Sequence, residues 1–150
     1  MAHSLRAHYF HIVWATKNRN PLITPTIQKG LYPYMGGIIR NHQSVPLAIG
    51  GVSDHVHLLI ELKKCDHYST LIKNVKTFSS HWVHKNFPEH KAFAWQEGYA
   101  SFSVSYSGLN QVKNYIQHQE KHHQSMSFEE EYLKILQHCQ IKFDDRFVMG

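Results

Sequence analysis

Apolar and polar positions follow two different periods along this chain, and the two periods predict alternating strands and helices. Runs rich in β-branched and aromatic residues predict strands, and apolar residues recurring every three to four positions predict helices. The predicted strands are 9–15, 45–52, 55–62 and 93–105, the last with a bulge expected at Gly98. The predicted helices are 25–42, 68–86, 109–123 and a final helix that begins after Ser127.

The helix boundaries carry their own signals. Thr24 precedes the first helix and is a suitable cap, and Phe87-Pro88 ends the second. Ser127 and Glu130 have the spacing of a capping box at the start of the last helix. The order of elements predicts an α+β fold, with an antiparallel sheet and helices mainly on one face.

Length and composition favour a single folded domain. The chain has 150 residues, of which 42% are hydrophobic, so we expect one domain over 1–150 with 124–150 as a C-terminal helical extension. No apolar run approaches the ~20 residues that would span a bilayer, and the first residues lack the apolar core of a secretory signal. Cys65 and Cys139 are expected to be free thiols in a reducing cytoplasm.

The formal net charge of +5 favours a polyanionic partner, with nucleic acid as the first candidate. Phosphate contacts by lysine and arginine are independent of sequence, so any cluster of these residues is a candidate DNA contact. The candidates selected here are Lys17, Arg19, Lys73, Lys76 and Lys113. Three tryptophans could stack on unpaired bases: Trp14, Trp82 and Trp95. Such residues more often belong to the core, and the helical spacing of Trp82 favours the core for it.

The motif His55-Val56-His57 lies inside the apolar run 55–62. Successive side chains of a strand point to opposite faces, so His55 and His57 share one face while Val56 takes the other. Two neutral imidazoles on a rigid strand provide two ligands of a metal site and leave the third to be found. Asp54 is expected to be a turn residue or a hydrogen-bond partner of a ligand rather than a ligand itself.

Tyr115 and Gln119 are four residues apart on the predicted helix 109–123, so they lie on one helical face. They border the apolar stripe of that helix, where packing could hold them while they reach a cleft. Taken alone, Tyr115 would be interpreted as an ordinary tyrosine at the edge of the core.

Together these segments resemble a known family. The stretch 53–59 resembles the His-hydrophobic-His ("HUH") motif of the small single-tyrosine transposases of bacterial insertion sequences, the IS200-like family. The stretch 115–119 resembles the Tyr-x-x-x-Gln helix of that family. Two further stretches, 11–19 and 95–105, are similar to sequences of the family. The resemblance covers about 8–123, and its specificity comes from the order and spacing of motifs that are weak individually.

The resemblance implies a set of roles. Tyr115 would attack a scissile phosphodiester of single-stranded DNA at a hairpin-bearing element end, forming a 5′-phosphotyrosine and releasing a 3′-OH. His55, His57 and Gln119 would hold one Mg²⁺ or Mn²⁺, which would compensate for the poor nucleophilicity of a phenol with a pKa near ~10. The resemblance also implies a ferredoxin-like or RNA-recognition-like sheet, a bacterial cytoplasmic location and a homodimer in which the helix of Tyr115 could complete the partner's site.

Several alternatives stay open at this stage. The histidine-triad nucleotide hydrolases need a third histidine where this chain has Leu59, so that class is excluded. A catalytically silent single-strand binding module and a domesticated relative acting on chromosomal palindromes would share the scaffold. Tyr99, Tyr106 and Tyr132 are rival nucleophiles, none of which fits the tyrosine–glutamine motif. The pair His122-His123 is interpreted as surface residues.

Overall fold

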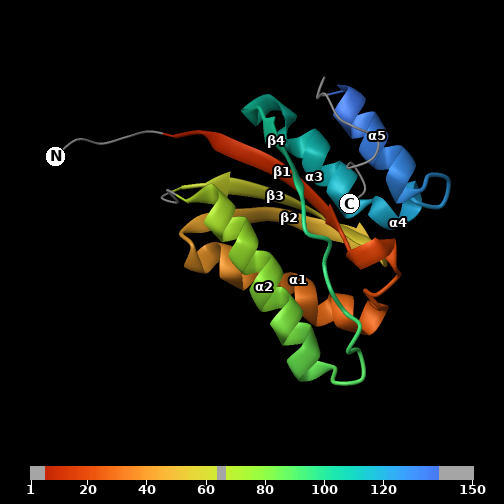
Figure 1. The fold of residues 1–150 in the computed structure, drawn as a ribbon. Coiled ribbons are helices and arrows are strands. Elements are labelled where there is room, and N and C mark those ends of the chain that lie inside the picture. The colour runs from red at the N-terminus through yellow and green to blue at the C-terminus, as the bar shows by residue number, and fades with distance from the viewer. Residues whose placement is uncertain (1–5, 64–66, 139–150) are drawn as a thin grey trace.

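The computed structural model describes residues 6–63 and 67–138, so Cys65 and Cys139 lie outside the described residues. Four strands form one antiparallel sheet in the order β2-β3-β1-β4 (Figure 1). The strands are β1 (His8–Ala15), β2 (Ser44–Val52), β3 (His55–Leu62) and β4 (Ala100–Val104). The predicted α+β class with an antiparallel sheet is therefore confirmed, and β3 lies inside the sheet with a neighbour on each side.

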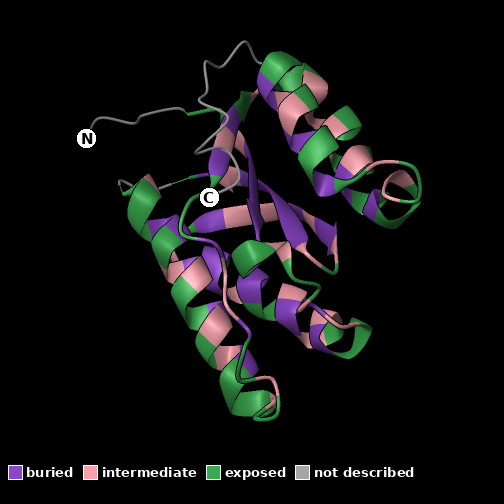
Figure 2. Cartoon of the chain, turned by 45° about the vertical axis from the view of Figure 1, so that its right-hand side comes forward, coloured by how far each residue is buried: buried purple, intermediate pink, exposed green. Residues whose placement is uncertain are grey.

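Two long helices cover one face of the sheet. They are α1 (Pro25–Asn41) and α2 (Tyr68–Asn86), which lie side by side below the strands in Figure 1. Their apolar faces pack on buried side chains of β1 and β3, including Trp14, Val56 and Leu58. Figure 2 shows the result as buried strands and inward helix faces, with exposed residues on the outer faces of the helices. This is the main hydrophobic core.

Three shorter helices lie over the opposite face: α3 (Leu109–Gln117), α4 (Gln119–His122) and α5 (Phe128–His138). α5 packs on Val13, Ala15 and Phe102, and α3 packs through Ile116 on Leu59 of β3. The expectation of helices mainly on one face holds for the long helices, and the short ones form a third layer. No described helix is long and apolar enough to cross a membrane.

The predicted strand 93–105 is shorter than expected. Only β4 joins the sheet as a strand, and the segment before it makes a single isolated bridge between Thr16 and Trp95. Lys76 of α2 explains the difference, because its Nζ donates to the carbonyls of Gln96, Glu97 and Gly98 at 2.7, 2.9 and 3.0 Å. Those carbonyls are bonded to a side chain instead of a neighbouring strand, and Gly98 lies in a loop rather than a bulge.

Both predicted helix caps are present. The Thr24 hydroxyl accepts a hydrogen bond from the backbone N–H of Ile27 at 3.2 Å, and the Ser127 hydroxyl accepts one from Glu130 at 3.2 Å. Two short 3₁₀ turns, Lys17–Arg19 and Tyr106–Gly108, follow β1 and β4.

The predicted helix 109–123 is interrupted at His118. The backbone leaves helical geometry there (φ −111°, ψ 28°), and the His118 Nδ1 bonds to the carbonyl of Asn114 at 2.6 Å. A side chain that takes the i−4 carbonyl competes with the helical ladder. The break starts the new helix α4 at Gln119, whose side chain turns into the protein with 1% exposure.

Gly50 fixes how closely α3 approaches the sheet. It pairs with His57 in the β2–β3 ladder, and a Cβ built on it would lie 2.3 Å from the carbonyl oxygen of Ile116. Any side chain at position 50 would therefore push α3 outward. The helix that carries Tyr115 is thus positioned by the absence of a side chain on β2.

We expect Gly50→Ala to destabilise the protein by about 1–3 kcal/mol, because the added methyl group overpacks the contact with α3. Urea unfolding measures the change. The matched control is Gly37→Ala in α1, where an added Cβ meets nothing within 4 Å. That substitution should stabilise by up to about 1 kcal/mol through helix propensity. Equal effects at the two positions would contradict the close approach of α3.

Candidate active site

His55 and His57 are fully buried on β3, and their side chains share the face covered by α3–α5. Leu59 continues the same face and packs against Ile116 of α3, whereas Val56 belongs to the core on the other side. The alternation predicted for this strand is present in the structure. The two imidazoles therefore point into the third layer, away from the main core.

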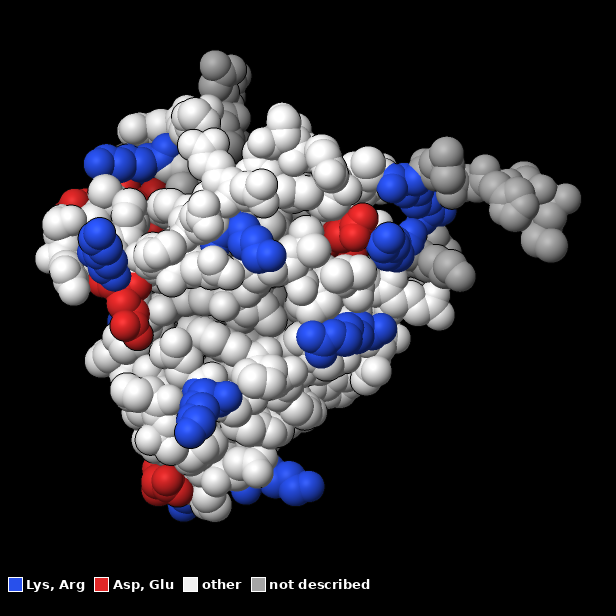
Figure 3. Space-filling model, turned by 180° about the vertical axis from the view of Figure 1, so that it is seen from behind, with Lys and Arg blue, Asp and Glu red and all other residues white. Residues whose placement is uncertain are grey.

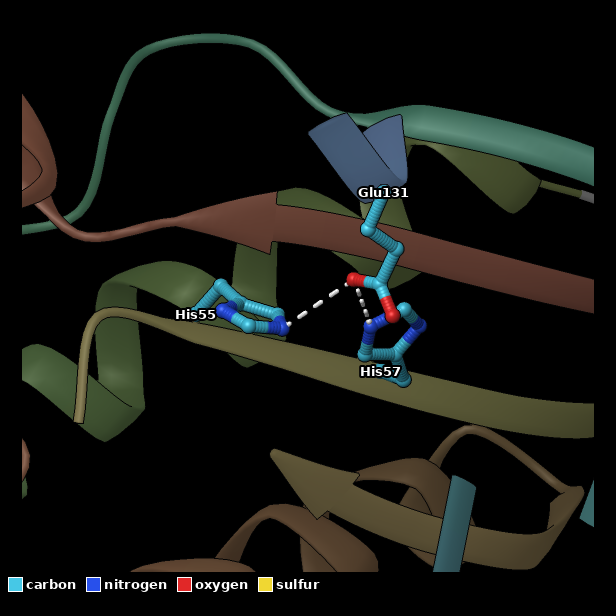
Figure 4. Close-up of side chains that lie close together, drawn as sticks. All are labelled: His55, His57 and Glu131. Atoms are coloured by element: carbon cyan, nitrogen blue, oxygen red, sulfur yellow. Dashed lines mark hydrogen bonds and ion pairs between the residues drawn. The ribbon is translucent and has the colours of Figure 1, made fainter. Parts of the chain in front are cut away.

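Glu131 of α5 lies between the two histidines. Its Oε1 is 2.9 Å from Nε2 of His57 and 3.2 Å from Nε2 of His55, and the residue is 1% exposed. Figure 4 shows the carboxylate reaching down from α5 toward β3, with both imidazole rings turned to it. These three residues form a group whose ligand atoms all lie within 4.8 Å of one another.

Tyr115 reaches the same carboxylate from α3. Its hydroxyl donates a short hydrogen bond to Oε2 of Glu131, and its ring lies edge-on to the ring of His57 with centroids 5.7 Å apart. A single chain thus brings the candidate nucleophile to the two histidines. The hydroxyl and both Nε2 atoms share one carboxylate.

Gln119 is oriented by its own helix. Its amide nitrogen donates to the carbonyl of Tyr115 at 3.3 Å, which turns Oε1 toward Nε2 of His55 at 3.1 Å. The amide oxygen is the atom that could bind a cation. The structure brings together all four residues selected from the sequence for the chemistry: Tyr115, His55, His57 and Gln119.

Two neighbours fix the far sides of the imidazole rings. Asp54 accepts a hydrogen bond from Nδ1 of His55 at 2.7 Å, which is the supporting role expected from the sequence. His11 of β1 is buried, and its Nε2 lies 2.8 Å from Nδ1 of His57. Each ring is therefore held so that its Nε2 faces Glu131.

The expectation that His122 and His123 are both surface residues is wrong for His123. Its side chain is 9% exposed, and its Nε2 lies 3.1 Å from Oε1 of Gln119 and 3.2 Å from Oε2 of Glu131. Its Nδ1 bonds to the carbonyl of Met126 at 2.6 Å. The turn between α4 and α5 thus places the His123 imidazole against the side chains of Gln119 and Glu131, whereas the His122 side chain is 36% exposed.

The charges of the site are strongly coupled. Burial opposes ionisation of Glu131, but hydrogen bonds from His123, His55 and His57 outweigh it and hold the pKa of the carboxyl far below its usual range. Burial lowers the pKa of His55, yet the carboxylates of Asp54 and Glu131 outweigh this effect and raise it to about 9. Burial, together with the hydrogen bond to Glu131, raises the pKa of Tyr115 well above its usual value.

The residues present fit a divalent cation. Nδ1 of His55 donates to Asp54, so its Nε2 faces two oxygens, from Gln119 and Glu131, and needs a proton or a metal ion there. Imidazole nitrogens with a carboxylate and an amide oxygen are a donor set that first-row transition metals accept. His55, His57 and Glu131 could hold the ion, with the oxygen of Gln119 beside them.

The candidate DNA contacts come from three places: Lys17 and Arg19 follow β1, Lys73 and Lys76 of α2 line one cavity, and Lys113 lies on α3. Lys17, Lys73 and Lys113 are exposed, whereas Arg19 is 3.5 Å from Glu129 and the Lys76 ammonium is bonded to three backbone carbonyls. Figure 3 shows lysine and arginine scattered over one face with few acidic groups among them. Trp14 is fully buried and is not available to stack on a base.

Sequence reasoning missed Glu131, His123 and His11. Glu131 was detectable, because it lies three residues after Phe128 and four before Ile135, on the apolar face by which α5 packs. A carboxylate on the buried face of a helix needs a partner, and this one has the histidines of β3. His123 and His11 carry no comparable signal, because their placement depends on a turn and on strand register.

The four-stranded sheet and the buried histidine–glutamate cluster define an α+β protein with a candidate metal site, and the sequence identifies its family. The chain belongs to the IS200-like transposase family, whose model matches residues 4–119. His123 and Glu131 lie beyond the matched segment. Among curated proteins, no sequence matches the chain.

Two solved structures have a similar fold. A candidate transposase from Deinococcus radiodurans R1 is 22% identical, with a TM-score of 0.63 over 79% of this chain and 95% of that one. A REP-associated tyrosine transposase, bound to a REP hairpin, is 16% identical, with a TM-score of 0.62 over 82% of this chain and 74% of that one.

Removing the carboxylate should leave buried imidazoles without their anionic partner. We expect Glu131→Ala to destabilise the protein by about 3–5 kcal/mol at neutral pH, as for a buried pair that loses one member. Urea unfolding at pH 7 is the measurement. The control is Glu130→Ala on the exposed side of the same helix, which should change stability by about 0.5 kcal/mol or less. A similar small change at position 131 would contradict the burial of its charge.

Proposed function

We propose that this protein is a metal-dependent tyrosine transposase that cuts and rejoins single-stranded DNA. Tyr115 attacks the scissile phosphorus, a bond forms between the tyrosine oxygen and phosphorus, and the bond from phosphorus to the 3′ oxygen breaks. Tyr115 loses its phenol proton and the leaving 3′ oxygen gains a proton, so the products are a 5′-phosphotyrosine and a free 3′-OH. A 3′-OH of another strand can reverse the step, so rejoining needs no ATP.

One observation carries this proposal. The hydroxyl of Tyr115 and the Nε2 atoms of His55 and His57 all contact the carboxylate of Glu131 within one chain. The place that the carboxylate takes is therefore adjacent to a nucleophile and to two metal-binding nitrogens. An ion held by these groups could bind a phosphate oxygen, which would bring the phosphodiester within reach of the tyrosine hydroxyl.

When bound, the divalent ion would neutralise the charge on the phosphate oxygens and orient the phosphate for in-line attack. His55, His57, Glu131 and Gln119 would hold the ion. Asp54 and His11 keep the two imidazole rings in the orientation that this requires. Tyr115 needs this assistance, because burial and Glu131 keep its phenol protonated.

The expected partner is single-stranded DNA that carries a hairpin. The relative solved with a REP hairpin supports this choice of partner, as does the net charge of +5. The homodimer and the choice of Mg²⁺ or Mn²⁺ stay predictions. Because one chain already joins Tyr115 to the histidines, we propose that strand cleavage does not require a residue from a second copy.

The central test replaces the nucleophile. Tyr115→Phe should abolish the covalent protein–DNA adduct, because only the attacking oxygen is removed, while binding of the same DNA changes less than about threefold. Denaturing gels detect the adduct, and fluorescence anisotropy measures binding. Tyr99→Phe is the control, since Tyr99 is exposed, and it should form adduct like the parent protein. Adduct formation by Tyr115→Phe would refute the assignment.

The metal site has a separate test. His57→Ala should weaken Mn²⁺ binding at least about tenfold, because a direct ligand contributes no less than the groups that orient ligands. Calorimetry in the absence of DNA measures the affinity. His81→Ala is the control, because His81 is exposed on α2, which covers the opposite face of the sheet. Equal Mn²⁺ affinities for the two variants would place the metal elsewhere.

A further inference from the structure

A cavity of about 660 Å³ opens beside Tyr115, between the edge strand β4 and the helices α3 and α5. Tyr115 and Glu131 both line it, so it begins where the candidate nucleophile and the carboxylate meet. The cavity is within the size range of small-ligand sites. None of the sequence motifs points to it, and the proposed chemistry does not use most of its walls.

The walls of the cavity are mainly apolar. Phe102 and Val104 come from β4, Val112 from α3 and Ile135 from α5. Polar groups are present as well, because Gln111, Ser105 and Lys134 also line the cavity, and all three are exposed. Apolar walls with an amide, a hydroxyl and an ammonium group suit a flat, partly polar ring attached to an anionic chain.

The position restricts the ligand further. The phosphate attacked by Tyr115 is covalently joined to two nucleosides, so at least one base must lie within a nucleotide's length of the tyrosine hydroxyl. A second cavity, of about 410 Å³, is lined by Gly50, Ile116 and Gln119, but neither Tyr115 nor Glu131 contributes to it. Of these two cavities, the one lined by β4 is therefore better placed for a flanking base.

We propose that this cavity binds the unpaired base of a nucleotide next to the phosphate that Tyr115 attacks, an inference that rests on the proposed function. The face of the base packs on Val112 and Ile135, and Gln111 is within the cavity to bond its edge. Lys134 is placed to contact a neighbouring phosphate. Holding one base in this way positions the strand for attack, and single-stranded DNA is required because a paired base cannot enter.

The first experiment uses cross-linking. Tyr115→Phe protein, which cannot cleave, is bound to an oligothymidylate of about twenty nucleotides in which single thymines are replaced by 5-iodouracil. Irradiation and peptide mapping should locate cross-links in 102–105, 111–112 or 134–135. Cross-links confined to other segments, or no binding of the strand, would overturn the inference.

The second experiment measures how much the bases contribute to the affinity for single-stranded DNA. The Tyr115→Phe protein should bind oligothymidylate at least about tenfold more tightly than an abasic strand of equal length. Ile135→Trp fills the cavity from α5 and should reduce that ratio at least about threefold. Leu133→Trp is the control, since Leu133 is also half-buried on α5 but does not line the cavity, and it should preserve the ratio.

The proposal of a base site would be overturned if the ratio of the two affinities were equal in Tyr115→Phe protein and in the same protein with Ile135→Trp or Leu133→Trp added. The proposed function is judged separately, by adduct formation in protein that retains Tyr115. Adduct without any effect of Ile135→Trp on the ratio would leave the transposase proposal standing and remove the base site alone. Thermal unfolding of each variant verifies that the substitutions preserve the fold.

Discussion

The carboxylate of Glu131 is the interaction on which the third layer of this protein depends. It is almost fully buried, and it contacts His55, His57, His123 and Tyr115. A buried charge is tolerated only when partners compensate for the lost solvation, and here imidazole groups do so. The cluster therefore forms only when α5 packs on the sheet, because α5 carries the Glu131 carboxylate that pairs with the histidines.

The sheet makes this cluster possible. β3 is an inner strand, so its neighbours hold His55 and His57 at fixed positions, and β1 adds His11 behind one ring. Gly50 on β2 lets α3 approach until Tyr115 meets the histidines. The histidine pair, the tyrosine helix and α5 come from distant parts of the sequence, yet each is positioned by direct contact with the same face of the sheet.

The local elements were predictable because their signals are local. The pattern of apolar residues located three strands and both long helices, but it extended the fourth strand over 93–105, of which only Ala100–Val104 is a strand. The residue types of Thr24 and Ser127 located two caps, and strand alternation placed His55 and His57 on one face. The motif resemblance selected Tyr115 and Gln119. The break at His118 was not predictable, because it arises from one hydrogen bond between a side chain and the backbone. The folding of His123 into the site depends on the turn between α4 and α5, where its Nδ1 bonds to the carbonyl of Met126.

The proposed function requires that Tyr115, at the site formed with His55, His57 and Glu131, becomes covalently linked to DNA. The most direct measurement incubates the protein with hairpin-bearing single-stranded DNA, with and without Mn²⁺, and maps the DNA-linked peptide by mass spectrometry. We expect a single phosphotyrosine at Tyr115, formed only with the metal. A link at another residue, or one formed equally well without metal, would contradict the proposed function.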